Sequence, residues 1–313
     1  MKKEWGWIIV LSLIIAVLLP WSLLRWINPQ EEAEDFHIRV LLPDGKVEEM
    51  GLEAYLVGVV AGEMPAQFEV EALKAQAIAA RTYAAKRLVQ AGSDQNQKYD
   101  VDTTVQTQVW LSEAQMKKKW GWNGYFKYEK RIREAVQATK GMVLVANGEY
   151  IDAYYHSSSG RKKTEKSEDV WSSARTYLKN VESGETNPQR FVKEYNFTPQ
   201  ELYQKLGITG TAQNFTNNDF QILNLTAAGR AKTVSLLGKT YQATKLRTLL
   251  GLASTDIECS ISPEKITFTT YGNGHGVGMS QYGANDLAAQ GSDYAKILNH
   301  FYPGTEILTL TKA

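Results

Sequence analysis

The sequence predicts an α+β fold, with a single globular extracytoplasmic domain that contains a substrate groove and follows one transmembrane helix. Residues 7–24 contain no charged side chain, and as a helix they are long enough to cross the apolar core of a bilayer. The remaining chain alternates irregularly between helical and strand patterns, and tight turns join its strands. This arrangement favours α+β over a doubly wound parallel sheet. Because 43% of the 313 residues are hydrophobic, the chain can bury a sizeable core.

Charges of opposite sign flank the N-terminal apolar segment. Lys2 and Lys3 precede it, whereas four acidic residues at positions 31–35 follow it, so the positive-inside rule places the N-terminus in the cytoplasm and the rest outside. The alternative is a cleaved signal peptide, but no good cleavage site follows Leu24. The expected segments are a cytoplasmic tip (1–6), a transmembrane anchor (7–27), a polar linker (28–35) and a globular domain (36–313).

The first elements of the globular domain follow from turns and helix-breaking residues. A strand pair is expected within residues 36–47, around the turn formed by Pro43, Asp44 and Gly45. Two helices then follow, because Pro65 excludes Met64 from the helical conformation between them. Their expected ranges are 52–60 and 69–91.

The later elements are indicated by hairpin dipeptides and by periodic apolar residues. Asn147-Gly148 is a strong hairpin signal, and the hairpin would lead into the segment HSSSG. The other expected elements are a strand at 103–110, a helix at 129–139 ended by Gly141, hairpin strands at 142–146 and 149–155, a hairpin of 221–225 with 233–237 around residues 228–230, and helices at 245–250 and 294–302.

Composition excludes several classes of function. The 35 basic and 34 acidic side chains leave a net charge of +1, which gives no general attraction to nucleic acid. The single cysteine, Cys259, rules out an internal disulfide and a site with several thiolate ligands. His156 and His275 do not lie in a recognisable ligand spacing, so we predict neither a metal nor another cofactor.

Glu63 is the strongest candidate for acid chemistry. It stands in the segment VVAGEMPA, at the corner between the two predicted helices, among apolar neighbours. A carboxyl group held against apolar surface has a raised pKa and can act as a general acid. The alternative is a solvated corner residue or a partner in helix capping.

The segment GHGVGMSQYGA is unusually rich in glycine. Gly272, Gly274, Gly276, Gly278 and Gly283 would let the backbone approach a ligand closely. His275 would be presented in this loop, and Ser280 is expected to cap the helix that follows. The spacing does not match the dinucleotide-binding fingerprint, and a simple set of turns is the alternative.

Two further possibilities are weaker. Gln76 and Arg81 lie on the second helix and could orient a carboxylate or a sugar amide, although a solvated helix face is the simpler interpretation. Three serines follow His156 directly, but residues so close in sequence rarely pair as nucleophile and base, and the chain has no nucleophile elbow.

Six blocks, in this order, resemble the stage II sporulation protein D family: YLVGVVAGEMPAQFEVEALKAQAIAARTYA, TTVQTQVW, EAVQATKGMVL, AYYHSSSG, LRTLLGLAST and GHGVGMSQYGA. The resemblance spans residues 36–313. It implies a membrane-anchored lytic transglycosylase that cuts peptidoglycan glycan strands during engulfment of the forespore. The implied partners are the amidase stage II sporulation protein P and the membrane protein stage II sporulation protein M.

The resemblance also assigns roles to residues. It implies that Glu63 is the catalytic acid, which would protonate the glycosidic oxygen and then accept a proton from the 6-hydroxyl of the muramoyl sugar. Because the substrate supplies the nucleophile, one carboxyl group suffices where hydrolytic glycosidases use two. The residues expected to contact the glycan are Gln76, Arg81, His156, Tyr177, His275 and Gln281. Some relatives bind zinc through cysteines beside the histidine of the HSSSG block, but serines stand there in this chain. A wall-binding module that enhances an amidase is the alternative function.

Overall fold

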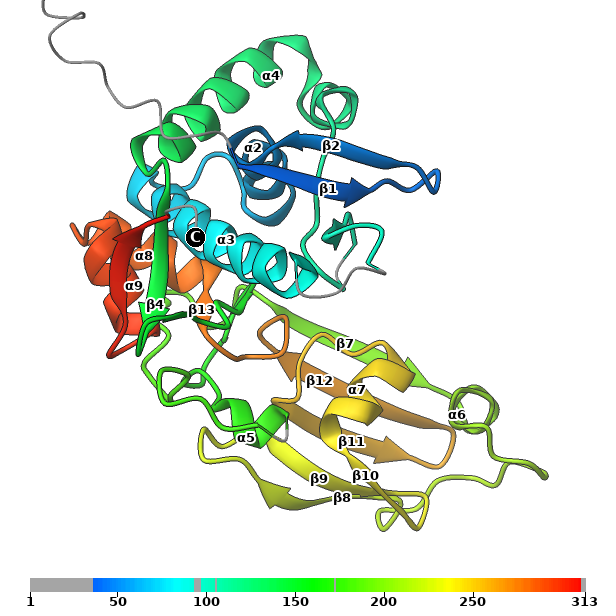
Figure 1. The fold of residues 1–313 in the computed structure, drawn as a ribbon. Coiled ribbons are helices and arrows are strands. Elements are labelled where there is room, and N and C mark those ends of the chain that lie inside the picture. The colour runs from blue at the N-terminus through cyan, green and yellow to red at the C-terminus, as the bar shows by residue number, and fades with distance from the viewer. Residues whose placement is uncertain (1–35, 93–96, 105, 172, 311–313) are drawn as a thin grey trace, which may run out of the picture. The chain divides into compact units, whose positions relative to one another are not determined.

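The computed structural model describes residues 36–92, 97–104, 106–171 and 173–310. Helices and short, mostly antiparallel sheets are mixed in them, which confirms the α+β class (Figure 1). The described residues from Ile38 onward belong to one compact unit. The predicted tip, anchor and linker lie outside the described residues. Within the ranges given above, no helix has the length and apolar character needed to cross a bilayer.

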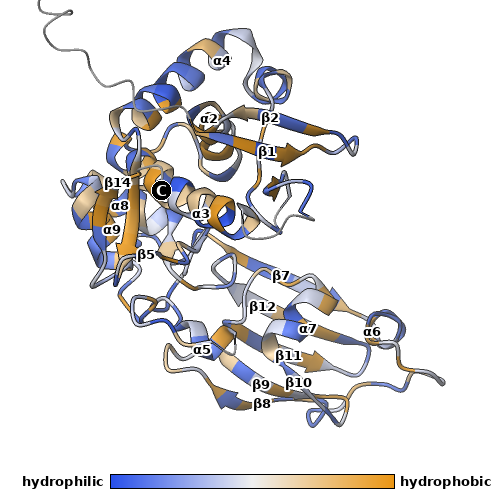
Figure 2. Cartoon of the chain, in the orientation of Figure 1, coloured by the Kyte–Doolittle hydropathy of each residue, from blue (hydrophilic) through white to orange (hydrophobic). Residues whose placement is uncertain are grey.

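Helix α3 (Val70–Gly92) is the centre of the first group of elements. It packs against α2 (Leu52–Glu63), α4 (Glu113–Ala138), β4 (Met142–Ala146), α8 (Gln281–Ala289) and α9 (Tyr294–Phe301). Its alanines are buried on several faces, because a small side chain lets neighbours approach from every direction. Figure 2 shows α3 with a mixture of hydrophobic and hydrophilic colouring. The predicted helices at 52–60, 69–91 and 294–302 are confirmed.

A small sheet covers α2. Strands β1 (His37–Leu41) and β2 (Val47–Gly51) are neighbours around the predicted turn, but β2 starts at Val47, where the predicted pair ends. The N–H of Gly45 closes the turn by donating to the Leu42 carbonyl. Strand β3 (Val101–Asp102) pairs with β1 in parallel. This third strand comes from the segment after α3.

The predicted strand at 103–110 is wrong. Its alternating Thr and Val residues imitate a strand, but the carboxylate of Asp102 accepts hydrogen bonds from the Thr104 backbone and hydroxyl, which forms a turn. The chain then runs along α2, where the N–H of Leu111 donates to the Gly58 carbonyl. The close contact requires glycine, because a Cβ on Gly62 would lie 2.5 Å from the Val109 carbonyl oxygen.

Helix α4 is longer than the predicted helix at 129–139, which corresponds to its C-terminal part. Ser112 and Gln115 form a capping box at its start, and Gly121, with φ of 67°, interrupts its helical geometry. Its N-terminal part lies outside the predicted range because tryptophans, tyrosines and two glycines obscure the helical period.

The hairpin at Asn147-Gly148 is confirmed, with positive φ at both residues. Its second strand, β5 (Glu149–Tyr150), is shorter than predicted, because the chain leaves the sheet to form β6 (Tyr155–His156). Strand β6 pairs in parallel with β13 (Met279–Ser280), which joins the HSSSG segment to the glycine-rich segment. Strand β14 (Glu306–Thr309) completes the sheet of β4 and β5.

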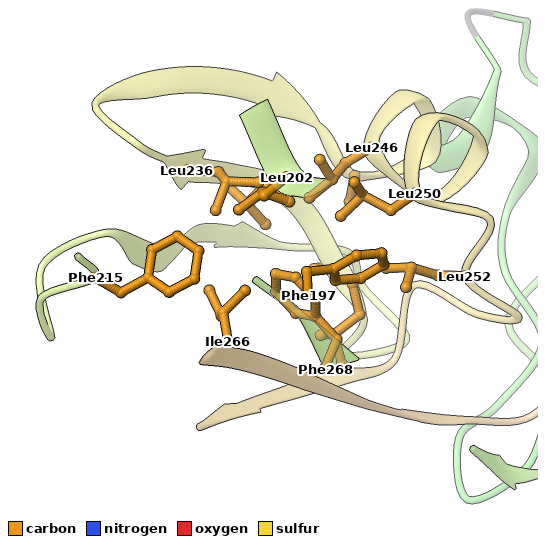
Figure 3. Packing of buried hydrophobic residues seen from close by; sticks show 13 residues of the cluster. Phe197, Leu202, Phe215, Leu236, Leu246, Leu250, Leu252, Ile266 and Phe268 are labelled. Carbon is orange, nitrogen blue, oxygen red and sulfur yellow. The ribbon is translucent and has the colours of Figure 1, made fainter. Parts of the chain in front are cut away.

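Two three-stranded antiparallel sheets and two helices form the second group of elements. The sheets have the orders β11-β12-β7 and β10-β9-β8. The bounds are β7 (Val192–Phe197), α6 (Pro199–Leu206), β8 (Phe220–Leu225), β9 (Ala231–Leu236), β10 (Lys239–Gln242), α7 (Ala243–Leu250), β11 (Ile257–Ser262) and β12 (Lys265–Tyr271), with the short α5 (Ser167–Val170) preceding them. Figure 3 shows their core, in which Leu246 and Leu250 of α7 face Ile266 and Phe268 of β12. The predicted hairpin and the helix at 245–250 are confirmed.

Candidate active site

A cavity of about 390 Å³ brings together Glu63, His156 and His275, which come from three distant parts of the sequence. Glu63 ends α2, His156 ends β6, and His275 lies in the loop before β13. Other lining residues were not predicted from the sequence: Tyr83, Gln108, Tyr154, Tyr155, Trp171 and Arg247. Glu63 is the only carboxylic acid among the described residues that line this cavity.

The position of Glu63 follows from the end of its helix. Met64 has extended backbone angles because Pro65 follows it, so α2 stops at Glu63 and leaves this side chain at the corner. One carboxylate oxygen, Oε1, accepts a hydrogen bond of 2.7 Å from the N–H of Val109. Burial raises the pKa of Glu63, and the hydrogen bonds from Val109 and Gln281 only partly oppose this. The raised pKa favours the protonated acid.

Gln76 and Gln281 lie behind Glu63 rather than along the cavity. Gln76 is fully buried, and its Oε1 accepts from the side-chain amide of Gln281 at 3.4 Å. Gln281 also hydrogen-bonds to the carboxylate of Glu63. These two residues therefore position the acid, whereas the sequence had suggested that they contact the glycan.

Tyr155 presents a hydroxyl donor to the same cavity. The amide nitrogen of Gln108 donates to the carbonyl of Ala80 at 3.3 Å, which fixes the orientation of this amide because a carbonyl can only accept. The amide oxygen accepts from the hydroxyl of Tyr55 at 3.2 Å, and the nitrogen also donates to the hydroxyl of Tyr155 at 3.0 Å. The hydroxyl of Tyr155 thus accepts on its buried side and keeps its own proton for the cavity. Burial raises the pKa of Tyr155, and the charge of Glu63 adds to this, so the proton stays bound.

The two histidines are neutral. Nδ1 of His275 accepts from the N–H of Val277 at 3.1 Å, and burial lowers the pKa of His275 to about 4, with Arg247 contributing. Burial also lowers the pKa of His156, whose Nδ1 lies 3.1 Å from the Val277 carbonyl. Since a carbonyl only accepts, Nδ1 of His156 carries the proton. The two rings therefore line the cavity without adding charge, and both nitrogens of His156 bond within the protein.

His156 and Ser159 are closer than the sequence suggested, with Nε2 and the hydroxyl oxygen 2.7 Å apart. They do not form a nucleophilic pair, because Ser159 is only 1% exposed. The serines instead fix the loop. The carboxylate of Glu185 accepts from the Ser158 hydroxyl, the Ser159 N–H and the Ser280 hydroxyl. Glu185 therefore joins the HSSSG segment to the start of α8, where Ser280 is the N-cap, as predicted.

The glycine-rich segment approaches protein rather than ligand. A Cβ on Gly278 would lie 2.0 Å from the Tyr154 carbonyl oxygen, and one on Gly274 would lie 2.8 Å from the Cβ of His156. At Gly283 the distance to the Ser183 carbonyl oxygen would be 1.8 Å. Only Gly274 of these glycines lines the cavity, as the sequence suggested. At Gly278 and Gly283 the absent side chain instead lets two protein segments pass in close contact, and this packing places His275 beside His156.

An aromatic wall and a cation complete the cavity. The rings of Tyr154 and Trp171 lie 4.7 Å apart between centroids, and Trp171 lies 5.0 Å from His275. Trp171 is 39% exposed, so its ring can receive a ligand. Arg247, on α7, lines the cavity, and burial lowers its pKa. A partly desolvated guanidinium favours an anionic partner.

Known proteins share these segments. A family model described as Stage II sporulation protein matches residues 44–145. The chain is 40% identical over 263 residues to stage II sporulation protein D of Bacillus amyloliquefaciens and, to the same extent, to that of Bacillus subtilis, which covers 83% of this chain and 75% of each relative. The chain belongs to the stage II sporulation protein D family. It is also 32% identical over 306 residues to the amidase enhancer of Bacillus subtilis, covering 80% of this chain and 40% of that protein.

Within this family member, Arg81 does not reach the cavity, which corrects its expected contact with the glycan. Its side chain is fully buried and forms a bidentate ion pair with Glu53, with bonds of 2.9 and 2.6 Å. It also donates to the carbonyls of Val136 and Met142. Arg81 therefore joins α2, α3, α4 and β4, and its donors are used inside the protein.

Tyr177 lines a different cavity, of about 470 Å³, together with Lys86 and Arg175. Its hydroxyl accepts from the N–H of Asp152 at 2.9 Å, and the Asp152 carboxylate pairs with Lys86 and Arg175. Tyr177 is 8% exposed. The expectation that it contacts a glycan beside Glu63 is therefore corrected.

In the described part of this stage II sporulation protein D relative, no group of three or more His, Cys, Asp or Glu side chains could hold a metal ion. Three of the lining residues that were not predicted lie in blocks that carry the family resemblance: Tyr154 and Tyr155 in AYYHSSSG, and Arg247 in LRTLLGLAST. The blocks mark these segments, but nothing in the sequence shows that these three side chains meet Glu63.

Proposed function

We propose that this protein is a lytic transglycosylase that cleaves the bond between N-acetylmuramic acid and N-acetylglucosamine in peptidoglycan strands. The observation that carries this proposal is the single carboxyl group of Glu63, which has a raised pKa and lies in a cavity lined by aromatic groups, neutral polar groups and the guanidinium of Arg247. A hydrolytic glycosidase would need a second carboxyl group to activate water or to attack the sugar. Of the described lining residues, none other than Glu63 supplies one.

The proposed reaction uses Glu63 twice. Protonated Glu63 donates its proton to the glycosidic oxygen as the bond to the muramoyl C1 breaks. The resulting carboxylate then accepts the proton of the muramoyl 6-hydroxyl, whose oxygen bonds to C1 and gives a 1,6-anhydro product. The hydrogen bond from Val109 holds the carboxylate in place for both steps. The hydroxyl of Tyr155 would donate to an oxygen of the bound sugar.

The cavity walls suit an N-acetylated sugar with an acidic group. The ring of Trp171 can pack against the apolar face of a pyranose, because it is partly exposed and supported by Tyr154 and His275. Arg247 can bind a carboxylate of the muramoyl unit. The neutral rings of His156 and His275 complete the wall of the cavity.

We also propose that residues 7–27 anchor the chain in the cell membrane, with the N-terminus in the cytoplasm and the enzymatic domain outside. This proposal is supported by the uncharged run at 7–24 and by the charges on its two sides. The family membership supports a role in engulfment of the forespore, together with stage II sporulation proteins P and M. The similarity to an amidase enhancer supports a functional link with a wall amidase.

The Glu63→Gln variant tests the activity. We expect it to fold with an unchanged Tm and to release no 1,6-anhydro-muramoyl products from purified glycan strands, measured by mass spectrometry. The matched control is Glu69→Gln, which changes an exposed glutamate of the same corner and should retain full activity. Full activity in the folded Glu63→Gln variant would disprove the assignment.

A second candidate function is a binding module that enhances an amidase without cutting glycans, which the 32% identity to the amidase enhancer favours. It predicts wall binding and stimulation of an amidase with no new chain ends. Product analysis on defined strands, with and without stem peptides and without an added amidase, distinguishes the two functions.

A further inference from the structure

The N-terminal half of α4 displays aromatic and basic side chains outside the cavity described above. We call residues 117–130 the aromatic–basic segment. Trp122 and Phe126 are 65% and 62% exposed, which is unusual for such large apolar side chains. Trp120, Tyr125 and Tyr128 lie beside them and are partly buried.

The two halves of α4 differ in what they contact. The C-terminal half buries Ile132, Ala135 and Val136, whereas Met116 is the buried residue of the N-terminal half. The rings of the segment pack among themselves, with 6.2 Å between the centroids of Trp122 and Phe126 and 5.6 Å between those of Trp120 and Tyr128. The interior of the fold therefore does not account for this cluster of rings.

Lysines surround the rings. Nζ of Lys117 lies 4.7 Å from the ring centroid of Trp122, and Nζ of Lys119 and Lys127 lie over Trp120 and Tyr128 at 5.5 and 5.6 Å. Basic residues outnumber acidic ones clearly along α4, although the chain as a whole carries a net charge of only +1. The segment is thus a local positive surface that also exposes large aromatic groups.

This combination fits the surface of an anionic bilayer. Tryptophan and tyrosine favour the interface between headgroups and acyl chains, and lysines attract anionic lipid headgroups. A glycan strand is a less suitable occupant, because Trp122 and Phe126 project from a helix and are largely exposed instead of lining a groove.

The predicted chain path brings the domain near such a surface. Strand β1 begins at His37, and α2 packs against both the neighbouring β2 and α4, so this part of the fold follows directly after the predicted linker at 28–35. A linker of this length spans at most about 30 Å. The predicted anchor would therefore keep the domain within reach of the outer leaflet.

We propose that the aromatic–basic segment docks on anionic lipid headgroups, with Trp122 and Phe126 inserted among them. The proposal draws on the membrane anchoring proposed above, but its own contacts are those of α4. Docking through α4 would fix the orientation of the domain on the membrane. The Glu63 cavity would then contact the peptidoglycan at a fixed distance from the membrane surface.

Depth-dependent quenching in vesicles tests this contact. The full-length chain, with Cys259→Ser, receives a single fluorescent label at Asn123→Cys or, as a control, at the exposed Gln204→Cys of α6, which Figure 1 shows far from α4. The protein is incubated with vesicles of phosphatidylcholine, alone or mixed with phosphatidylglycerol, in which some lipids carry a quencher. We expect quenching at position 123 to be at least about threefold stronger with phosphatidylglycerol and to fall in high salt, with no such change at position 204.

Paired variants assign the effect to the rings. Trp122→Ser with Phe126→Ser should abolish the difference, whereas Leu223→Ser with Leu225→Ser, which removes two exposed leucines of β8, should leave it unchanged. Equal quenching at both label positions would overturn the proposal. A response of the position-123 label to glycan strands without lipid, in place of a response to vesicles, would also overturn it and indicate a wall ligand.

Separate measurements show whether the proposed docking of α4 fails or the proposed function fails. Resistance of the protein to carbonate extraction from the vesicles reports on the anchor alone. Release of anhydro products reports on the Glu63 reaction alone. Quenching at position 123 reports on α4 in either case.

Discussion

The backbone N–H of Val109 donates to the carboxylate of Glu63 at 2.7 Å, although the two residues are separated by the whole of α3. Val109 reaches this position because the segment after β3 lies directly against α2, and Gly62 leaves room for its carbonyl. Glu63 is therefore oriented by a segment for which the sequence pattern predicts a strand.

Gly62→Ala should weaken this arrangement. The added methyl group would lie 2.5 Å from the Val109 carbonyl oxygen, so the segment must move and its hydrogen bond to Glu63 must lengthen. We expect a loss of about 1–3 kcal/mol in the free energy of unfolding, measured with denaturant, and a lower kcat. Gly92→Ala is the control, because its methyl group meets nothing within 4 Å. Unchanged stability and kcat would contradict the importance of the contact.

Tyr155→Phe should reduce turnover without unfolding the protein. The substitution removes the hydroxyl donor facing the cavity and leaves one amide proton of Gln108 without its partner. We expect kcat on glycan strands to fall about 10-fold or more, at a stability cost of about 1–3 kcal/mol. Tyr55→Phe is the control, since Tyr55 bonds to the same amide but is absent from the cavity lining. Equal losses of kcat in both variants would mean that the hydroxyls of Tyr155 and Tyr55 act only by stabilising the fold.

Activity should depend on pH with limbs of opposite sign. The first step needs protonated Glu63, and burial raises its pKa, so activity is expected below the raised pKa and is lost as pH increases through it. His275 has a pKa of about 4, so its protonation adds positive charge to the cavity only below that value. This charge gives the acidic limb of the profile, in which activity is lost as pH decreases. A profile of kcat/KM against pH measures both limbs. Activity that rises steadily into alkaline pH would contradict the role of Glu63 as an acid.

The buried neutral histidine also links stability to pH. In the unfolded chain His275 binds a proton below about pH 6.5, whereas in the fold it does so only near 4. Between these values the unfolded state binds more protons, so the free energy of unfolding falls as pH falls, by at most about 1.4 kcal/mol per pH unit from this group. His275→Gln should flatten the slope between pH 6.5 and 4 in denaturant titrations, and an unchanged slope would refute this linkage.

Arg81 should prove structural. Arg81→Met leaves the carboxylate of Glu53 without its partner, and we expect a loss of about 3–5 kcal/mol in the free energy of unfolding. Adding Glu53→Gln to the same chain should recover part of this loss, because it removes the unpaired charge. Turnover per folded molecule should stay close to that of the parent. A stable but inactive Arg81→Met variant would restore the direct role implied by the family resemblance.

Local rules predicted much of the fold and one part of the site. Pro65 ended α2 at the residue where the acid stands, and Asn147-Gly148 made the hairpin that precedes β6. Local rules failed at 103–110, because the alternation of side chains there reflects a tight turn and close contact with α2 rather than a sheet. They also failed for Gly278 and Gly283, whose neighbours are protein segments far away in sequence.

The sequence by itself determined the α+β class, the family and the corner between two helices at which Glu63 stands, because turns, caps and motifs are properties of neighbouring residues. Only the tertiary structure decided which side chains meet. It placed Arg81 and Tyr177 away from the cavity and brought Tyr155, Trp171 and Arg247 into it. The physical reason is that burial, pKa and hydrogen-bond direction depend on contacts between segments such as α2 and the residues after β3. No local pattern of residues encodes these contacts.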